Sequence, residues 1–390
     1  MREMKDSGIA WIGAMPRAWK MNTIAQIFLQ VKCKNTGLQE KNLLSLSYGK
    51  VKRKSIDTVE GLLPESFDGY NIIEKDDIVL RLTDLQNDHT SLRVGLAEER
   101  GIITSAYLTI RNRSNFCPKY LYYYLHSFDI AKGFYGMGAG VRQGLNWDGI
   151  KWLKILAPSV PEQERIAAFL DAECAEIDTV LEKTRASIEE YKKLKQAVIT
   201  QAVTKGIRGD RPMKGSGIEW IGEIPAGIPI SRVGLHFDIV LGKMLCSAPV
   251  DDNYTLESYY CAADVHFEGL SNGEKKKMWF SPDEKEQYCV KNGDLLVVEG
   301  GAGAGGCAIA ASTDVPIYIQ NSIMIVRSKG ISNIRYLRYL LECLVKKGYI
   351  DVVCNKATIP HFTKDKLANV PFIVFSQSEQ EEIAEYLNEK

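Results

Sequence analysis

The sequence predicts an α+β protein built from two duplicated globular units, each followed by a long helix. An internal repeat, short β-branched and aromatic runs of strand type, and one long uninterrupted helical segment support this fold class. The chain has 390 residues, which suits about two or three domains. The predicted boundaries are 1–158 and 207–375 for the globular units, 159–206 for the central helix and 376–390 for the start of a second helix.

The repeat is visible in two pairs of segments. Met4–Pro16 recurs as Met213–Pro225, with nine of 13 positions identical at an offset of 209 residues. Glu162–Asp171 recurs as Glu379–Asn388, with six of ten positions identical at an offset of 217 residues. Collinear echoes of this kind indicate a duplication of one structural unit.

Within each unit the expected elements follow in the same order. Apolar runs broken by Gly, Asn and Asp predict strands at Ile72–Leu82, Ile102–Ile110, Leu295–Val298 and Ile317–Val326. Apolar residues at helical spacing predict helices at Pro118–Ser127 and Ile334–Val345. Each unit then ends in an S-x-x-E capping box, in which a hydroxyl and a carboxylate satisfy free backbone N–H groups, at Ser159 to Glu162 and Ser376 to Glu379.

The segment from Glu162 to Gly206 has no interior Gly or Pro, and Gly206 supplies a stop signal. Acidic residues dominate its first half and basic residues its second half, in agreement with the helix dipole. Its 3–4 spacing predicts a coiled-coil or partner-binding seam of Ile166, Leu170, Ile177, Leu181, Ile188, Tyr191 and Val198. The sequence stops at Lys390, before the counterpart helix is complete, so we expect this seam to take a partner or a second copy.

Composition excludes several classes of protein. The chain has 49 Lys and Arg against 49 Asp and Glu, so it does not bind DNA by bulk positive charge, although a local basic surface is still compatible. Nine cysteines without a C-x-x-C pair predict reduced thiols and no zinc site. No signal-peptide core or run of 18 apolar residues is present, so we expect a cytoplasmic protein.

The pattern Ser-Gly-Ile-x-Trp-Ile-Gly-x-x-Pro before each unit, with Glu-Gln-x-x-Ile opening each following helix, resembles the specificity subunit of type I restriction-modification enzymes. The resemblance covers nearly the whole chain. It implies two target-recognition domains that read the two parts of a bipartite double-stranded DNA target, and an antiparallel coiled coil that sets the gap. It also implies a non-catalytic scaffold for two methyltransferase subunits and for motor-endonuclease subunits. S-adenosylmethionine, ATP and Mg²⁺ would then belong to those partners, and this chain would hold no cofactor.

Polar and basic clusters are the candidate DNA contacts. In general, Gln and Asn side chains bind adenine and Arg binds guanine. In this sequence, the clusters of cations beside Tyr48 and Trp279 are candidates for contacts with DNA phosphates. The candidates are Lys50, Lys52, Arg53, Lys54, Arg81, Gln86, Asn87, Arg93, Arg142, Gln143, Lys275, Lys276, Lys277 and Lys356. The alternative for each is an ordinary solvated face, or a loop whose side chains close turns on themselves.

Two other functions compete with DNA recognition. A stand-alone methyltransferase is disfavoured, because Gly301–Gly306 lacks the helix and acidic residue of a dinucleotide site and Asn369–Phe372 lacks the first proline of the catalytic tetrad. The five histidines show no metal or triad spacing. The second alternative is a coiled-coil assembly protein without affinity for DNA, from which salt-dependent DNA binding would distinguish our interpretation.

Overall fold

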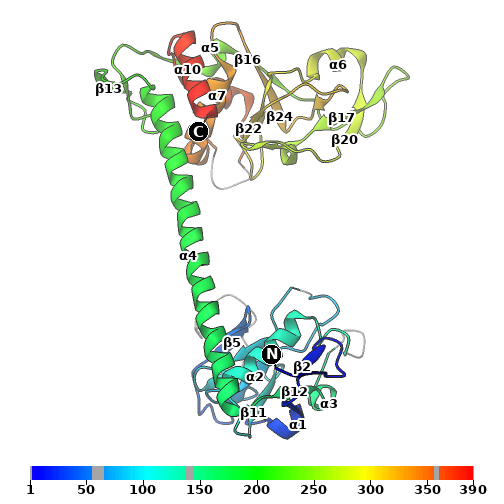
Figure 1. The fold of residues 1–390 in the computed structure, drawn as a ribbon. Helices are drawn as coiled ribbons and strands as arrows, with labels where there is room; N and C mark the ends of the chain where they lie inside the picture. The colour runs from blue at the N-terminus through cyan, green and yellow to red at the C-terminus, as the bar shows by residue number, and fades with distance from the viewer. Residues whose placement is uncertain (1, 55–65, 89, 138–143, 355–359, 390) are drawn as a thin grey trace. The chain divides into compact units, whose positions relative to one another are not determined.

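A computed structural model describes residues 2–54, 66–88, 90–137, 144–354 and 360–389. The chain divides into two compact units, unit 1 (Met1–Glu182) and unit 2 (Lys183–Lys390), with the division inside helix α4 (Val160–Lys205). Figure 1 shows α4 as one continuous helix. Each unit combines small, mainly antiparallel sheets with helices, as the predicted α+β class requires.

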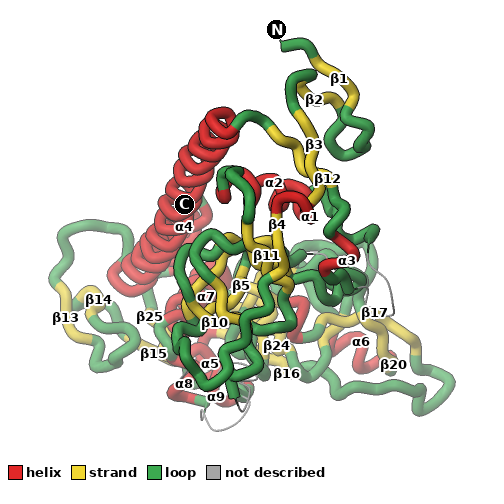
Figure 2. Tube along the Cα trace, turned by 90° about the horizontal axis from the view of Figure 1, so that it is seen from below, coloured by secondary structure: helices red, strands yellow, loops and turns green. Residues whose placement is uncertain are grey.

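Unit 1 is organised around a four-stranded antiparallel sheet against which helix α2 (Pro118–Ile130) packs. The strand order is β4 (Phe28–Gln30), β11 (Leu108–Asn112), β8 (Ile78–Leu80) and β9 (Val94–Leu96). The smaller antiparallel pairs are β1 (Met4–Asp6) with β2 (Ala14–Pro16), β3 (Lys20–Thr23) with β12 (Lys154–Ala157), β5 (Leu44–Ser47) with β6 (Lys50–Arg53), and β7 (Asn71–Ile73) with β10 (Gly101–Ile103). The β1–β2 hairpin is clear in Figure 2. Two single-turn helices are α1 (Ile24–Ile27) and α3 (Trp147–Ile150).

Unit 2 repeats this plan and contains a three-stranded sheet beside its central sheet. Its four-stranded sheet has the order β16 (Phe237–Leu241), β24 (Ile323–Ser328), β21 (Leu295–Val298) and β22 (Cys307–Ile309). Hairpin β13 (Met213–Gly215) with β14 (Glu223–Pro225) and pair β15 (Ile230–Arg232) with β25 (Pro371–Ile373) correspond to β1–β2 and β3–β12. The other strands are β17 (Thr255–Tyr260), β20 (Lys276–Phe280), β23 (Tyr318–Ile319), β18 (Val265–His266) and β19 (Gly269–Leu270). The three-stranded sheet has the order β20-β17-β23.

Most helices of unit 2 pack on its largest apolar core, to which α4 contributes Ile199, Ala202 and Val203. Helix α7 (Ile334–Lys346) is the counterpart of α2, and α10 (Gln377–Asn388) lies beside it in Figure 1. The shorter helices are α5 (Val233–His236), α6 (Pro282–Tyr288), α8 (Tyr349–Val353), α9 (Lys364–Ala368) and the 3₁₀ turn η1 (Ala262–Asp264). Within the described residues, every helix is too short or too polar to cross a lipid bilayer.

A buried ion pair occurs at matching positions of the two central sheets. Asp77 precedes β8, and its carboxylate accepts two hydrogen bonds of 2.7 Å from the Arg111 guanidinium on β11. Asp294 precedes β21 and accepts the same pair of bonds from Arg327 on β24, at 2.8 and 2.7 Å. Both carboxylates are almost fully buried, and bidentate geometry is the strongest form of such a contact. The shared arrangement supports the duplication inferred from sequence.

A buried glutamine ties each long helix to the helix before it. Gln163 accepts a hydrogen bond of 3.0 Å from the backbone N–H of Cys117, the residue before α2, and donates one of 3.0 Å to the carbonyl of Pro158. Gln380 likewise accepts from the N–H of Asn333, before α7, and donates to the carbonyl of Phe375. Both side chains are fully buried, which explains the Glu-Gln pair in the repeated motif.

Of the two predicted capping boxes, the one at Ser376 is half correct, whereas the backbone N–H of Glu162 bonds the carbonyl of Ser159 and not its hydroxyl. The Ser376 hydroxyl accepts a hydrogen bond of 3.3 Å from the backbone N–H of Glu379, as expected. The glutamates, however, do not reach back to their own caps. Glu162 contacts Arg2 and accepts a hydrogen bond of 3.1 Å from the Trp19 indole, whereas Glu379 pairs with Arg211 at 2.7 Å. An ion pair between two charged groups is stronger than a carboxylate bond to a neutral N–H. These carboxylates therefore hold residues that lie close to the first hairpin of each unit, Arg2 and Trp19 in unit 1 and Arg211 in unit 2.

The predicted helices agree closely with α2, α7 and α4, and Gly206 ends α4 in the left-handed region at φ +76°. The predicted strand Leu295–Val298 is also confirmed. The other three predicted strands, by contrast, each contain a turn that separates two shorter strands. They are Ile72–Leu82, Ile102–Ile110 and Ile317–Val326. In the first of these runs, Asp76 takes a φ of +70°, which a regular strand does not accommodate.

Candidate nucleic-acid interface

The β5–β6 hairpin presents one polar face. Ser45 lies opposite Lys52, and Ser47 lies opposite Lys50, so these four side chains share one side of the ribbon. Leu46 lies opposite Val51 on the other side, where both pack into a small apolar cluster of unit 1. The two lysines are exposed, which leaves them accessible to phosphates.

The remaining cations of this segment already make contacts within the protein. Arg53 donates a hydrogen bond of 2.6 Å to Glu99, and this contact raises the pKa of Arg53 above its ordinary value. Lys54 is half-buried and already makes contacts within the protein. The ammonium of Lys50 lies 3.0 Å from the Asp178 carboxylate on α4, but both side chains are more than 60% exposed. An exposed pair of this kind contributes less than about 1 kcal/mol, so Lys50 can exchange Asp178 for a phosphate.

Arg93 is fully buried, so the prediction that it contacts guanine is wrong. All five of its N–H groups are engaged within unit 1. Nε donates to the Tyr135 hydroxyl, and the two Nη atoms donate to the carbonyl oxygens of Arg81, Thr83, Asp84 and Asp88. The guanidinium therefore acts as the internal support of the loop at 81–91, because it binds backbone carbonyls from both ends of that loop.

Two carboxylates complete this support. Hydrogen bonds from the Ser91 hydroxyl and backbone N–H lower the pKa of Asp88 to about 2, so it stays ionised 3.4 Å from the Arg81 guanidinium. Burial raises the pKa of Asp129, whose carboxylate accepts a hydrogen bond of 2.6 Å from the Arg93 backbone N–H. Arg81 is thus partly committed to an internal ion pair, with about a third of its side chain exposed.

The amides of the same loop remain open to solvent. Gln86 and Asn87 are both exposed, and Asn87 donates a hydrogen bond of 2.9 Å to Asp84. Each amide carries the paired donor and acceptor that recognise adenine, so both stay candidates for base contacts. Arg142, Gln143 and Lys356 were also predicted contacts, and they lie outside the described residues.

In unit 2, Lys275 is a structural residue, which contradicts its predicted role in phosphate binding. Its ammonium donates to the carboxylate of Asp264 at 3.1 Å and to the carbonyls of Ser271 and Gly273. All three of its N–H groups are therefore used. Burial opposes ionisation of Asp264, but hydrogen bonds from Cys261 and Lys275 leave its pKa lowered overall. Lys276 and Lys277, at the start of β20, are exposed and remain candidates.

The predicted seam of α4 is exposed at its middle and packed at its ends. Ile166 and Val198 lie against the cores of units 1 and 2, and Leu170 is half-buried. The four central positions are 47–72% exposed, which is unusual for large apolar side chains, and these are Ile177, Leu181, Ile188 and Tyr191. Because transfer of apolar surface out of water is favourable, such a row is typical of a surface that binds a partner.

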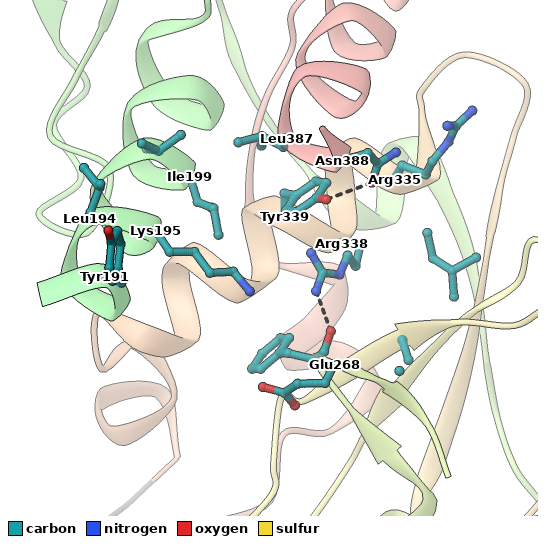
Figure 3. A pocket seen from close by; sticks show the side chains of 15 residues that line it. Tyr191, Leu194, Lys195, Ile199, Glu268, Arg335, Arg338, Tyr339, Leu387 and Asn388 are labelled. Atoms are coloured by element: carbon teal, nitrogen blue, oxygen red, sulfur yellow. Dashed lines mark hydrogen bonds between the residues drawn. The ribbon is translucent and has the colours of Figure 1, made fainter. Parts of the chain in front are cut away.

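A cavity of about 830 Å³ in unit 2 begins where this row ends (Figure 3). Tyr191, Leu194 and Lys195 of α4 form one wall, and Arg338 and Tyr339 of α7 form another. The Tyr339 hydroxyl donates a hydrogen bond of 2.8 Å to Asn388 at the end of α10, and Arg338 binds the carbonyl of Phe267. Sequence reasoning missed this cavity, because its walls come from three helices, the turn between β18 and β19, and strand β22, which are distant in the chain.

The segments weighed for catalysis have structural roles. Gly301–Gly306 forms turns that lead into strand β22, where a dinucleotide site would need a helix. Val370 and Phe372 of the Asn369–Phe372 segment are fully buried. Among the described residues, no group of three His, Cys, Asp or Glu side chains is placed to hold a metal ion.

The comparisons with known proteins found one family model and several solved structures that this chain resembles. Residues 268–389 match the family described as the type I restriction modification DNA specificity domain. A chain from a solved type I R-M system, studied for complex assembly and conformational transition, is 18% identical with a TM-score of 0.69, over 96% of this chain and 90% of its own. The HsdS subunit from Thermoanaerobacter tengcongensis is 16% identical with a TM-score of 0.53, over 96% and 89%. At these identities the likeness is one of fold. No relative was found among curated proteins.

We expect Arg93→Met to lower the free energy of unfolding of unit 1 by roughly 2–4 kcal/mol, because several buried carbonyls lose their donors. Urea denaturation of the full chain measures this change. Gln86→Ala, in the same loop but exposed, is the matched control and should change stability by less than about 0.5 kcal/mol. Equal midpoints for both variants would contradict the structural role of Arg93.

Proposed function

We propose that the two units of this chain each read one part of a bipartite DNA target. The premise is that residues 268–389 belong to the type I restriction modification DNA specificity domain family. The chain shares its mixed fold and long helix with solved type I proteins. It is a DNA-recognition subunit of a type I restriction-modification system and is itself non-catalytic.

The observation that carries the proposal is the duplicated framework with different surfaces. Both units contain the Asp–Arg pair and the buried glutamine at matching positions. Their accessible polar groups differ, with lysines and amides on the hairpin and loop of unit 1 and Lys276 and Lys277 on β20 in unit 2. A repeated scaffold with unlike surfaces suits a target whose two parts have unlike sequences.

Helix α4 connects the units, and in this proposal its length sets the gap between the two parts of the target. A helical partner binds the exposed row of α4, which consists of Ile177, Leu181, Ile188 and Tyr191. Two methyltransferase subunits dock on the chain, and motor-endonuclease subunits join them. S-adenosylmethionine, ATP and Mg²⁺ are held by those subunits. The net charge of zero suits a protein that grips DNA together with its partners, since few free cations are needed on any one chain.

The exposed row on α4 also favours a second candidate function. A protein that assembles others through a coiled coil, with no affinity for DNA, would need the same apolar surface. DNA binding by the chain and its complex therefore separates the two functions.

The direct test is co-expression with the methyltransferase subunit, followed by sequencing that maps methylated bases in cellular DNA. We expect methylated adenine at a single motif of two parts with a fixed gap, because one rigid helix permits one spacing. Co-purification of a complex without any methylated motif would favour the assembly function. A chain that binds neither the subunit nor DNA would contradict both.

Lys276 and Lys277 provide a test of phosphate binding. Replacing both with Gln should reduce the slope of log K against log salt by about 0.9 for each phosphate that is no longer neutralised, and weaken binding to a mixed-sequence duplex at low salt. Fluorescence anisotropy with the complex at several salt concentrations measures the slope. Lys192→Gln on α4, which removes one exposed charge, is the control. An unchanged slope in the double variant would exclude phosphate binding by β20.

Ile188 provides a test of the helical partner. We expect Ile188→Glu to reduce capture of the methyltransferase subunit at least ~10-fold, because a charge would then be buried in the apolar contact. Thermal stability of the chain alone should stay the same, since Ile188 is 48% exposed. Ala186→Glu places the same charge on the opposite side of the helix and should leave capture unchanged. Equal capture by both variants would rule out this row as the docking surface.

A further inference from the structure

Tyr48 stands alone at the tip of the β5–β6 hairpin. The two strands are joined by only two residues, Tyr48 and Gly49, because Ser47 pairs directly with Lys50. Both residues have positive φ angles, +47° and +74°, which is the geometry of a type I′ turn. The Tyr48 side chain is 89% exposed, the highest value among the large hydrophobic side chains that are exposed in the described part of the chain.

This residue is a poor choice for the stability of the hairpin. A bulky side chain is disfavoured at positive φ, and Asn is the usual residue at the first position of a type I′ turn. The aromatic ring also gains nothing from packing, since almost all of it faces water. Strain at an exposed position points to a contact made outside the free protein.

The turn is nevertheless held firmly. A Cβ atom at Gly49 would lie 3.1 Å from the Leu92 side chain and 3.5 Å from His126, so the turn packs directly on helix α2 and on the end of the loop at 81–93. The backbone of the turn is therefore held in place by packing, and the Tyr48 ring projects from it into solvent. The same contact brings the hairpin tip next to the loop that carries Gln86 and Asn87.

We propose that Tyr48 is a base-contacting residue of unit 1, an inference that rests on the proposed function. The β5–β6 ribbon enters the major groove of the target duplex, which is wide enough for two strands. There the ring lies against the bases at the tip, while Lys50 and Lys52, on the polar face just behind it, hold the flanking phosphates. An aromatic face supplies apolar contact to a thymine methyl or stacks on an opened base step.

Unit 2 does not repeat this device in its described residues. Strands β17 and β20, which pair there, are separated by η1 and the β18–β19 pair in place of a two-residue turn. The tip of unit 1 is thus specific to one half of the chain. Tyr48 should accordingly affect only one part of a two-part target.

The decisive variant is Tyr48→Asn, because it removes the ring and suits the turn better. The full chain carrying it should melt at or above the temperature of the natural chain. In co-expression with the methyltransferase subunit, we expect methylation at the target motif to fall ~10-fold or more, or the motif to become degenerate in one part only. Tyr48→Phe keeps the ring and should retain the motif.

Leu38 offers a matched control. It also has a positive φ, +52°, and is partly exposed, but it lies outside the β5–β6 hairpin. Leu38→Asn should therefore raise stability in the same way and leave the methylated motif unchanged. This separates an effect of the Tyr48 ring from an effect of relaxing a strained turn.

Each outcome decides the inference. An unchanged motif and methylation level in Tyr48→Asn would overturn it and leave the proposed function intact. Loss of the methyltransferase subunit from the purified complex would overturn it in favour of a protein contact. If Tyr48→Phe lost as much methylation as Tyr48→Asn, the effect would belong to the hydroxyl and the inferred contact by the ring would be wrong. Absence of any methylated motif with the natural chain would overturn the proposed function, and this inference with it.

Discussion

The buried amides of Gln163 and Gln380 are the contacts on which the rest of the molecule depends. Each accepts a hydrogen bond from the residue before a helix and donates one to the carbonyl of the residue that leads into the next helix. An amide is suited to this position because it is both donor and acceptor without a charge to desolvate. The bonds fix where α4 begins in unit 1 and where α10 begins in unit 2. The Gln163 contact therefore orients α4 on unit 1. The Gln380 contact orients α10, which lines the cavity of unit 2.

Much of the framework could be predicted from sequence because it depends on local signals. The repeat, helices α2, α7 and α4, and the glycine stop at Gly206 all follow from spacing and backbone preference. The roles of Arg93 and Lys275 could not be predicted in the same way. Their donors are satisfied by carbonyls that come together only when the loops close, and a cation looks the same in sequence whether it is buried or exposed. The turns inside three strand-like runs were missed because apolar residues flank them on both sides.

The candidate interface therefore separates into fixed and exchangeable charges. Arg93 and Lys275 have no free donors and shape loops from within, whereas Lys52, Lys276 and Lys277 are exposed, and Lys50 holds only an exposed partner. A buried cation with all donors used is costly to displace, while an exposed one exchanges water or a carboxylate for a phosphate at little cost. Among the predicted contacts that the structure describes, the exchangeable cations are few, so their placement matters more than bulk charge, which agrees with a net charge of zero.

The apolar row along α4 has a consequence for how much of the free chain escapes aggregation. Exposure of this row to water costs free energy, and the row consists of Ile177, Leu181, Ile188 and Tyr191. The free chain therefore tends to bind any complementary apolar surface, including the same row on another copy of the chain. Chains made in excess of their partners would form aggregates or become substrates for quality control. The proportion in which the chain and its partners are synthesised would then set how much of it survives, quite apart from how tightly any single contact binds.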